Sequence, residues 1–380
     1  MNFDPTPEQQ AFLDGVVRLV RERVAPNALR WDEEGKWPAE VLPDLARAGL
    51  FGIYAPREHG GRGLDTVSYA LAIEELSAEL PALGIALSVN NSLVANPIAR
   101  FGTPEQKSRF LAPVASGKLL GAFALTEAEA GSDATRLSSR ARRDGSGYVL
   151  TGEKVMVTNG GPAGLFLVVV ATEPEKLARG LSAFLVPADA RGVSKGERDE
   201  LMGLRSADVR TVRFDSVRLG AEHRLGDEGH GLSVTVEALN AGRVGVGAQA
   251  VGIGRGALDR AVRHATTRRQ FGQTLGEIGP VQQMLAAAHT DLEAARVSVL
   301  HAAQCRDRGE SFSADASRAK LSASQAAVLA ASIAVQVFGG WGYLTATGVE
   351  RFYRDAKVTE LYEGTSEMQR IVLAGSLTRG

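Results

Sequence analysis

The chain has 380 residues, of which 44% are hydrophobic and 23% are charged, a composition typical of a soluble globular protein. This length allows two or three domains or one large composite unit. The formal net charge of −1 excludes a partner held mainly by bulk electrostatics, such as duplex nucleic acid or an anionic membrane.

Metal and disulfide chemistry are not indicated. The six histidines include no pair at metal-ligand helical spacing, so we expect no zinc or iron site. The single cysteine, Cys305, cannot form an intramolecular disulfide, and its alanine-rich surroundings predict an inert core thiol.

Secretion and membrane insertion are not indicated either. Residues 1–30 carry charges throughout and lack an apolar core of signal-peptide length. We see no apolar run long enough to span a bilayer, since Leu165–Ala171 has the length of a strand. We therefore expect a cytoplasmic protein.

Helices are predicted for the first third of the chain. Thr6-Pro7-Glu8-Gln9 and Thr103-Pro104-Glu105-Gln106 share one start signal, in which threonine can cap, proline fits the first turn and glutamine can complete a capping box. Apolar residues between Leu71 and Leu80 mark one face of a helix that ends before Pro81. Gly60–Gly63 predicts a loop.

Short strands are predicted from about Leu119 onward. Runs of β-branched and aromatic residues are separated by Gly, Asp, Asn and Pro, as in an all-β module of roughly 100 residues. Asp144-Gly145-Ser146-Gly147 predicts a hairpin connection. The runs are Phe123–Leu125, Tyr148–Leu150, Val155–Val157, Leu165–Val170, Ala183–Val186 and Val209–Phe214.

The last third is predicted to be helical again. A short terminal helix follows Thr365 and stops near Gly375, after long alanine-rich segments over 232–265, 281–308 and 313–338. The order helical, β, helical differs from the alternation of a doubly wound nucleotide-binding fold. We predict an α+β multidomain protein with domains at 1–118, 119–228 and 229–380.

Two polar turns at strand ends are candidates for ligand binding. In Phe123–Asp133 a strand ends at Thr126 and leads into a loop of small residues, whose N–H groups and hydroxyls could bind a flat heterocycle or phosphate oxygens. In Lys154–Gly160 another strand closes on a polar turn. An ordinary exit from a strand explains both segments as well.

Two further segments lie in the last third. The glycines of Gln336–Tyr343 let the backbone approach a ligand closely, although a helix C-cap and a turn also explain them. In Leu361–Arg370, Glu363 precedes a helix that Thr365 or Ser366 can cap, and Gly364 leaves space beside the carboxylate. A surface glutamate favoured by a helix N-terminus explains this pattern too.

Together and in this order, the four segments resemble the acyl-CoA dehydrogenase family. Its members carry a Thr-Glu…Gly-Ser-Asp segment, a Thr-Asn-Gly turn, a Gln-x-x-Gly-Gly-x-Gly-Tyr segment and a Tyr-Glu-Gly-Thr segment. The matching positions are Thr126–Asp133, Thr158–Gly160, Gln336–Tyr343 and Tyr362–Thr365. The resemblance covers essentially the whole chain and implies an N-terminal helical domain, a middle β-barrel or β-sandwich domain and a C-terminal four-helix bundle.

The resemblance implies FAD as cofactor. Positions matching the isoalloxazine and pyrophosphate end are Phe123, Leu125, Thr126, Gly131 and Ser132, with Met156 and Thr158 on the other side of the ring. Positions matching residues that reach the FAD of a neighbouring subunit are Arg268, Gln270, Phe271, Gln336, Gly339 and Gly340. Thr365 and Glu367 match residues that close over the cofactor. Because one site then draws on two chains, an obligate homotetramer, built as a dimer of dimers, is implied.

The reaction implied by the resemblance is α,β-dehydrogenation of an acyl-CoA thioester to a trans-2-enoyl-CoA. Glu363 takes an α-proton while a hydride leaves Cβ for flavin N5. Some members place the base immediately before the position of Arg243, but Gly242 stands there and cannot act as a base. Positions matching substrate contacts are Ser132, Asn240, Arg243 and Gly364.

Burial beside flavin and substrate is expected to raise the pKa of Glu363, and the following helix N-terminus to lower it. We expect burial to dominate.

The chain departs from the family pattern at two positions. Met156 stands where tryptophan usually flanks the flavin, and it makes a softer wall. Gly279 stands where a cofactor-contacting glutamine is common. Both changes concern how FAD is held and leave the role expected of Glu363 intact.

Substrate and partners are implied less directly. Ser88–Leu93 resembles the stretch that borders the acyl pocket of short-chain, butyryl-CoA dehydrogenase-like members, and an electron-transfer flavoprotein is the typical acceptor. Two alternatives remain. One is a related flavin oxidase or monooxygenase, and the other is a non-catalytic relative that binds flavin, CoA or nucleic acid.

Overall fold

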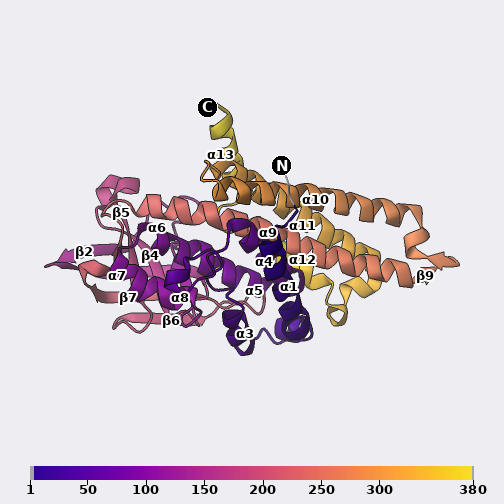
Figure 1. Ribbon diagram of the computed structural model, residues 1–380, viewed down its shortest axis with the longest axis horizontal. Helices are drawn as coiled ribbons and strands as arrows, with labels where there is room; N and C mark the ends of the chain where they lie inside the picture. The colour runs from indigo at the N-terminus through magenta and orange to yellow at the C-terminus, as the bar shows by residue number, and fades with distance from the viewer. Residues whose placement is uncertain (1–3, 379–380) are drawn as a thin grey trace.

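The computed structural model describes residues 4–378, and it has three parts along the chain (Figure 1). Helices make up the first part, a β-sheet the second and long helices the third, as predicted. The sheet lies at one end of an elongated molecule, and the tips of the long helices reach the other end (Figure 1).

The first part begins each of its two predicted helices with a complete capping box. The side chains of Thr6 and Thr103 accept from the N–H groups of Gln9 and Gln106, whose amide oxygens accept from the threonine N–H groups in return. The predicted helix before Pro81 is α4, which is buried along nearly its whole length. The helices are α1 Pro7–Leu19, α2 Ala28–Glu33, α3 Leu42–Arg47, α4 Thr66–Glu79, α5 Pro81–Ser88, α6 Asn96–Phe101, α7 Pro104–Gln106 and α8 Ala112–Ala115, with π-helical turns η1 Val20–Val24, η4 Val89–Ala95 and η5 Lys107–Leu111.

The second part is one mixed sheet in the order β6-β7-β3-β2-β4-β5-β8, with β1 paired parallel to β4. Its strands are β1 Gly121–Ala124, β2 Arg140–Asp144, β3 Gly147–Thr158, β4 Leu165–Ala171, β5 Leu181–Pro187, β6 Val193–Arg198, β7 Val209–Leu219 and β8 Arg224–Leu225. β4 is buried on both faces, which explains its unbroken apolar run. The predicted hairpin at 144–147 joins β2 to β3.

The sequence missed β2, β6 and the three two-residue strands β8, β9 Arg269–Gln270 and β10 Gln273–Thr274. β2 and β6 are charged and largely exposed, so they lack the apolar alternation that marks a strand. Two predicted runs, Tyr148–Leu150 and Val155–Val157, belong to the single long strand β3, whose pairing with β7 is interrupted by register shifts.

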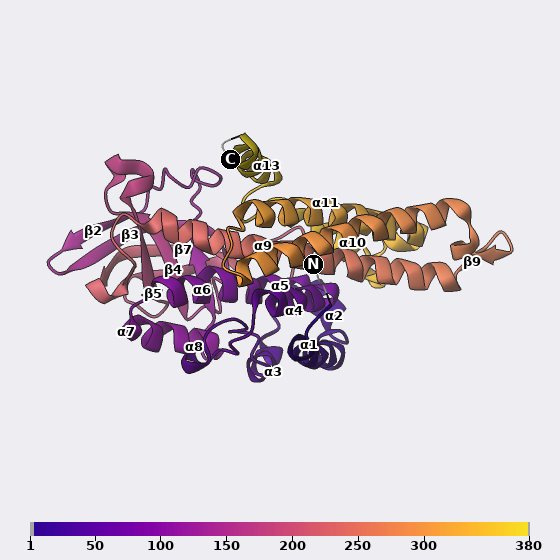
Figure 2. The ribbon, with the colours of Figure 1, turned by 45° about the horizontal axis from the view of Figure 1, so that its top comes forward.

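The third part contains α9 Gly231–Thr267, α10 Gly279–Asp307, α11 Ser313–Phe338, α12 Glu350–Val358 and α13 Ser366–Thr378, and a small hairpin of β9 Arg269–Gln270 and β10 Gln273–Thr274. The three long helices lie side by side, and α12 and α13 pack on α11 (Figure 2). The sequence missed α12, and α13 continues past Gly375 because a glycine near a helix end weakens a helix without stopping it.

Two helical stretches are long and apolar enough to cross a membrane by length and composition, Pro81–Phe101 and Ser313–Tyr343. The expectation that no apolar run reaches this length was therefore wrong, because alanine and other small residues make these stretches apolar without a conspicuous block of larger side chains. Of the most apolar 18 residues of each stretch, 94% are buried in the first stretch and 44% in the second. Both stretches act as packing helices in this fold, and such helices are weak evidence for a membrane.

A buried polar cluster joins the three parts. Asp355 in α12 accepts from the N–H of Leu204 in the β6–β7 loop at 2.5 Å, and Arg354 pairs with Asp32 in α2 at 2.8 Å. Complete burial raises the pKa of Asp355 to about 7. These contacts fix α12, which leads into the loop before α13, against residues more than 150 positions away in the sequence.

Candidate active site

Glu363 lies in a strained turn between α12 and α13. Both Glu363 and Gly364 have positive φ, +52° and +96°, a conformation that is costly for a residue with a side chain. The Gly364 carbonyl accepts from Lys320 Nζ and from Gln369 Nε2, each at 2.7 Å. The Tyr362 hydroxyl donates to Gln249 on α9, so side chains from three helices hold the turn.

The carboxylate of Glu363 has no hydrogen-bond partner among the described residues. Both of its oxygens are buried, although the residue as a whole is partly exposed. Burial raises the pKa of Glu363 to about 7, and the positive charges of Lys320 and Arg243 oppose this rise. Neither cation comes within 4 Å of the carboxylate, since no ion pair joins them to it. These two side chains therefore oppose the effect of burial, and the influence of the helix N-terminus that the sequence suggested stays a prediction.

Gly242 on α9 faces the same carboxylate. A Cβ atom placed on Gly242 would lie 1.9 Å from Glu363 Oε2 and 2.9 Å from Leu93 Cδ2. The position at which some relatives carry their base is thus in direct contact with Glu363. A side chain at position 242 would therefore collide with the carboxylate of Glu363 in its present position.

Two segments named from the sequence, Phe123–Asp133 and Lys154–Gly160, are tied together directly. The N–H of Val155 donates to the carbonyl of Thr126 at 2.9 Å. Lys154, fully buried, donates to the carbonyl of Leu125 at 2.9 Å and pairs with Glu127 at 2.7 Å. A buried lysine needs such partners, so Lys154 and Glu127 fix the spacing of the two segments.

The Thr158–Gly160 turn at the end of β3 contains a structural residue, Asn159, whose role the sequence did not predict. Asn159 has φ +67° and is fully buried, and its amide donates to the carbonyls of Ala86 and Gly121, both at 3.0 Å. Asparagine tolerates this left-handed conformation, which was the available signal. Asn159 anchors the turn so that its neighbour Thr158 remains partly accessible.

Met156 presents its side chain outward from β3. It has φ +54°, it lies within a register shift between β3 and β7, and it is 71% exposed. Bulges of this kind redirect side chains beside functional sites. Phe123, Leu125, Thr126 and Thr158 are partly buried on the neighbouring segments, and Gly131 and Ser132 are exposed on the loop.

The other residues expected at the cofactor gather far from Glu363. Phe338 stacks on His264 with ring centroids 4.2 Å apart, which brings the ends of α9 and α11 together. Arg268, Gln270, Phe271, Gln336, Gly339 and Gly340 lie at that end, and all are exposed. At 1.5 Å per helical residue, Arg268 is roughly 38 Å along α9 from Arg243. The β9 label in Figures 1 and 2 marks this distant tip.

The residues expected to contact the substrate also lie in two separate places. Arg243 Nη1 donates to Asn240 Oδ1 at 2.9 Å and to Ser317 Oγ at 3.3 Å, which places Arg243 and Asn240 near the Glu363 turn. Ser132 is exposed on the loop after β1. Thr365 caps α13 by accepting from the N–H of Met368 at 3.4 Å, and Glu367 is exposed in its first turn.

The stretch Ser88–Leu93 contributes less to the site than its resemblance suggested. Asn90 and Asn91 bond backbone groups of residues 50–53, Leu87 and Gly121, and Ser88 bonds the hydroxyl of Tyr69 at 2.7 Å. The side chain of Leu93 is the one that reaches the space beside Gly242.

The arrangement fits FAD. Gly131, Gly339 and Gly340 each have no other atom within 4 Å of the position a Cβ would take, so a ligand can approach their backbone. Met156 and Phe271, which is 93% exposed, offer apolar surfaces to a flat ring system. Gly279 is likewise open, consistent with the loss of a contact there.

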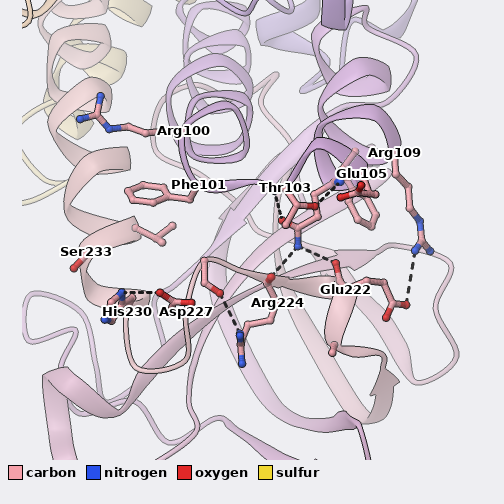
Figure 3. A pocket seen from close by; sticks show the side chains of 15 residues that line it. Arg100, Phe101, Thr103, Glu105, Arg109, Glu222, Arg224, Asp227, His230 and Ser233 are labelled. Atoms are coloured by element: carbon pink, nitrogen blue, oxygen red, sulfur yellow. Dashed lines mark hydrogen bonds and ion pairs between the residues drawn. The ribbon is translucent and has the colours of Figure 1, made fainter.

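A cavity of about 670 Å³ lies elsewhere, between α6, α7 and the start of α9 (Figure 3). Its charged side chains largely satisfy one another, as in the pairs Arg109–Glu222 and His230–Asp227. None of the residues expected at the cofactor or substrate lines it.

His301, Cys305 and Asp315 also come together, with ligand atoms within 4.8 Å of one another. Two arginines already bind these atoms, Arg308 at Cys305 Sγ and Arg318 at Asp315 Oδ1. The expectation that the chain holds no metal ion stays a prediction.

Comparison with known proteins identifies the family. The models of the acyl-CoA dehydrogenase N-terminal, middle and C-terminal domains match residues 6–118, 122–217 and 229–378. An acyl-CoA dehydrogenase of Bacillus subtilis is 40% identical over 98% of this chain and 99% of its own length.

Two solved structures superpose on the whole chain. Butyryl-CoA dehydrogenase from Megasphaera elsdenii has a TM-score of 0.98 at 38% identity, covering 99% of this chain and 100% of its own. A chain described as electron transferring flavoprotein of Acidaminococcus fermentans has a TM-score of 0.99 at 39% identity, covering 100% of both chains. The chain belongs to the acyl-CoA dehydrogenase family, with its three-domain fold, and is an FAD-dependent oxidoreductase.

Proposed function

We propose that this chain dehydrogenates short, straight acyl-CoA thioesters between Cα and Cβ, and that Glu363 is the base that removes the α-proton. The observation that supports this assignment most is the Glu363 carboxylate, buried, unpaired and with a pKa raised to about 7. A carboxylate without a partner in the free protein is available to a proton of the substrate. When bound, FAD accepts the hydride that leaves Cβ.

The α-proton of a thioester is weakly acidic, so the site has to stabilise negative charge on the thioester oxygen. The backbone N–H of Glu363 donates to no acceptor among the described residues, and it is free to donate to that oxygen. Lys320 and Arg243 add two buried positive charges near the reacting atoms. Proton removal by Glu363 and stabilisation of the resulting charge therefore arise from one turn.

We propose the short chain length from the relatives and from the space beside Gly242. Leu93 lies against α9 at this point, and the Tyr69 hydroxyl would meet a Cβ on Gly245, one turn further, at 2.0 Å. These side chains close the region in which an acyl chain would extend from Glu363. A butyryl-CoA dehydrogenase is among the proteins of the same fold and 38% identity.

Assembly into a homotetramer is part of this proposal. The residues expected at one FAD lie in two groups, one near Glu363 and one at the far tip of α9 and α11, and a single chain cannot close both around one cofactor. A neighbouring subunit would supply the second group. An electron-transfer flavoprotein is proposed as the acceptor, in keeping with the Acidaminococcus structure, and the cytoplasm as the location.

Glu363→Gln tests the assignment of the base. The variant is expected to keep its flavin and to lose about 10²–10⁴-fold in the rate at which butyryl-CoA bleaches the flavin, because the amide cannot accept the proton. The measurement is anaerobic rapid mixing followed by flavin absorbance. Glu175→Gln is the matched control, since Glu175 is exposed in the middle part of the chain and its replacement is expected to leave the rate within a few-fold. Near-normal bleaching by Glu363→Gln would sink the assignment.

Gly242→Ala tests the contact between α9 and the base. The added methyl group displaces the carboxylate, whose Oε2 would be 1.9 Å away, and a shift of about 1 Å can cost roughly 10²-fold in rate. Alanine favours a helix over glycine, so the melting temperature should not fall for reasons of helix propensity. An unchanged rate of flavin reduction at full flavin content would show that the carboxylate does not react from this position.

Phe271→Asp tests the shared cofactor site. The charge is expected to weaken both flavin retention and assembly, so that light scattering gives a mass below four chains and the absorbance shows lost flavin. Leu177→Asp is the control, because Leu177 is 52% exposed in the middle part, away from this tip. A wild-type protein that binds flavin fully as a monomer would contradict the two-chain site.

A further inference from the structure

Lys320 on α11 is a buried cation that the reaction described above does not use directly. Its side chain is fully buried, and its ammonium donates to the Gly364 carbonyl at 2.7 Å. No carboxylate among the described residues lies within 4 Å of it. An ammonium buried without an ion pair is costly, so a reason for its presence has to be found in its surroundings.

The hydrogen bond from Lys320 to the Gly364 carbonyl fixes the backbone next to Glu363. Glu363 and Gly364 both have positive φ, and Glu363 pays steric strain there. The same carbonyl accepts a second hydrogen bond, from Gln369 Nε2, also at 2.7 Å. Lys320 and Gln369, a neutral residue one turn into α13, therefore both hold the Gly364 carbonyl in place.

The charge of Lys320 is what Gln369 lacks. Glu363 is faced by Arg243 from α9, Lys320 from α11, the Tyr69 hydroxyl from α4 and Tyr362 from its own turn. Of these groups, Lys320 and Arg243 favour the ionised carboxylate, and Lys320 is the stronger of the two. Burial lowers the pKa of Lys320 to about 8, and the carboxylates of Glu363, Glu360 and Glu367 oppose this fall, so Lys320 is mostly protonated at pH 7. Burial alone would leave the base protonated over more of the pH range in which the protein operates.

We propose that Lys320 is a positioning residue of the reaction, which fixes the Glu363–Gly364 turn through the Gly364 carbonyl and keeps the base ionised through its buried positive charge. The inference rests on the proposed role of Glu363. It assigns to one side chain two effects that can be separated, because a hydrogen bond and a charge respond differently to substitution.

Three variants separate the two effects. Lys320→Gln keeps a hydrogen-bond donor and removes the charge, Gln369→Leu removes a hydrogen bond to the same carbonyl and leaves the charge, and Lys320→Arg keeps the charge. For each, the rate of flavin reduction by saturating butyryl-CoA is measured between about pH 5 and 9, together with flavin content and melting temperature.

The acid limb of the profile is the part in which the rate rises with pH. Lys320→Gln is expected to move this limb to a pH higher by roughly one unit, because loss of a nearby positive charge raises the pKa of a carboxylate. Gln369→Leu is expected to lower the maximal rate by about 10-fold with the acid limb in its wild-type position. Lys320→Arg should return the limb toward its wild-type position.

An acid limb that stays in place in Lys320→Gln overturns the charge role, and a full maximal rate in Gln369→Leu overturns the role of the Gly364 carbonyl. If Lys320→Gln does not retain flavin, Lys320→Met, which also lacks the charge, replaces it, and an acid limb that keeps its wild-type position in that variant overturns the charge role. Failure of the proposed function can be told apart from these outcomes, because butyryl-CoA would then still bleach the flavin of Glu363→Gln at a near-normal rate.

Discussion

A carboxylate that is buried without a hydrogen bond is the constraint around which the site is organised. Both oxygens of Glu363 lack a partner, and an isolated buried charge is strongly disfavoured unless other groups compensate. Gly242 leaves the space that the carboxylate occupies, and Lys320 and Arg243 supply positive charge without touching it. The result is a carboxylate with a pKa raised to about 7 and no hydrogen-bond partner among the described residues, which suits the proposed role of a base.

The rest of the fold brings these groups together from distant parts of the sequence. Glu363 follows α12, which Asp355 and Arg354 connect to the β6–β7 loop and to α2. Lys154 and Glu127 connect the two segments that flank the expected flavin position. The residues proposed for the far end of FAD lie at the opposite end of α9, and the length of this helix is the reason for proposing that a second chain supplies them.

Much of the architecture could be predicted from the sequence, because it depends on local signals. The capping boxes at Thr6 and Thr103, the hairpin at 144–147 and the apolar run of β4 each have a nearby physical cause. The site could be predicted through resemblance alone, since Glu363 by itself has the pattern of a surface residue. Lys320 carries no comparable signal, because the Gly364 carbonyl that it binds is remote in the sequence and meets it only in the folded chain. β2 and β6 were missed for a related reason, since pairing with neighbours and not apolar alternation makes them strands.

The central claim is that Glu363 is the proton acceptor and that burial sets its pKa near 7. The most direct measurement is the pH dependence of flavin reduction by saturating butyryl-CoA in the wild-type protein. A carboxylate must be ionised to accept a proton, so the rate is expected to rise with pH through a single ionisation near 7. A rate that is independent of pH between about 5 and 9, or one that falls as pH rises through this range, would contradict the account.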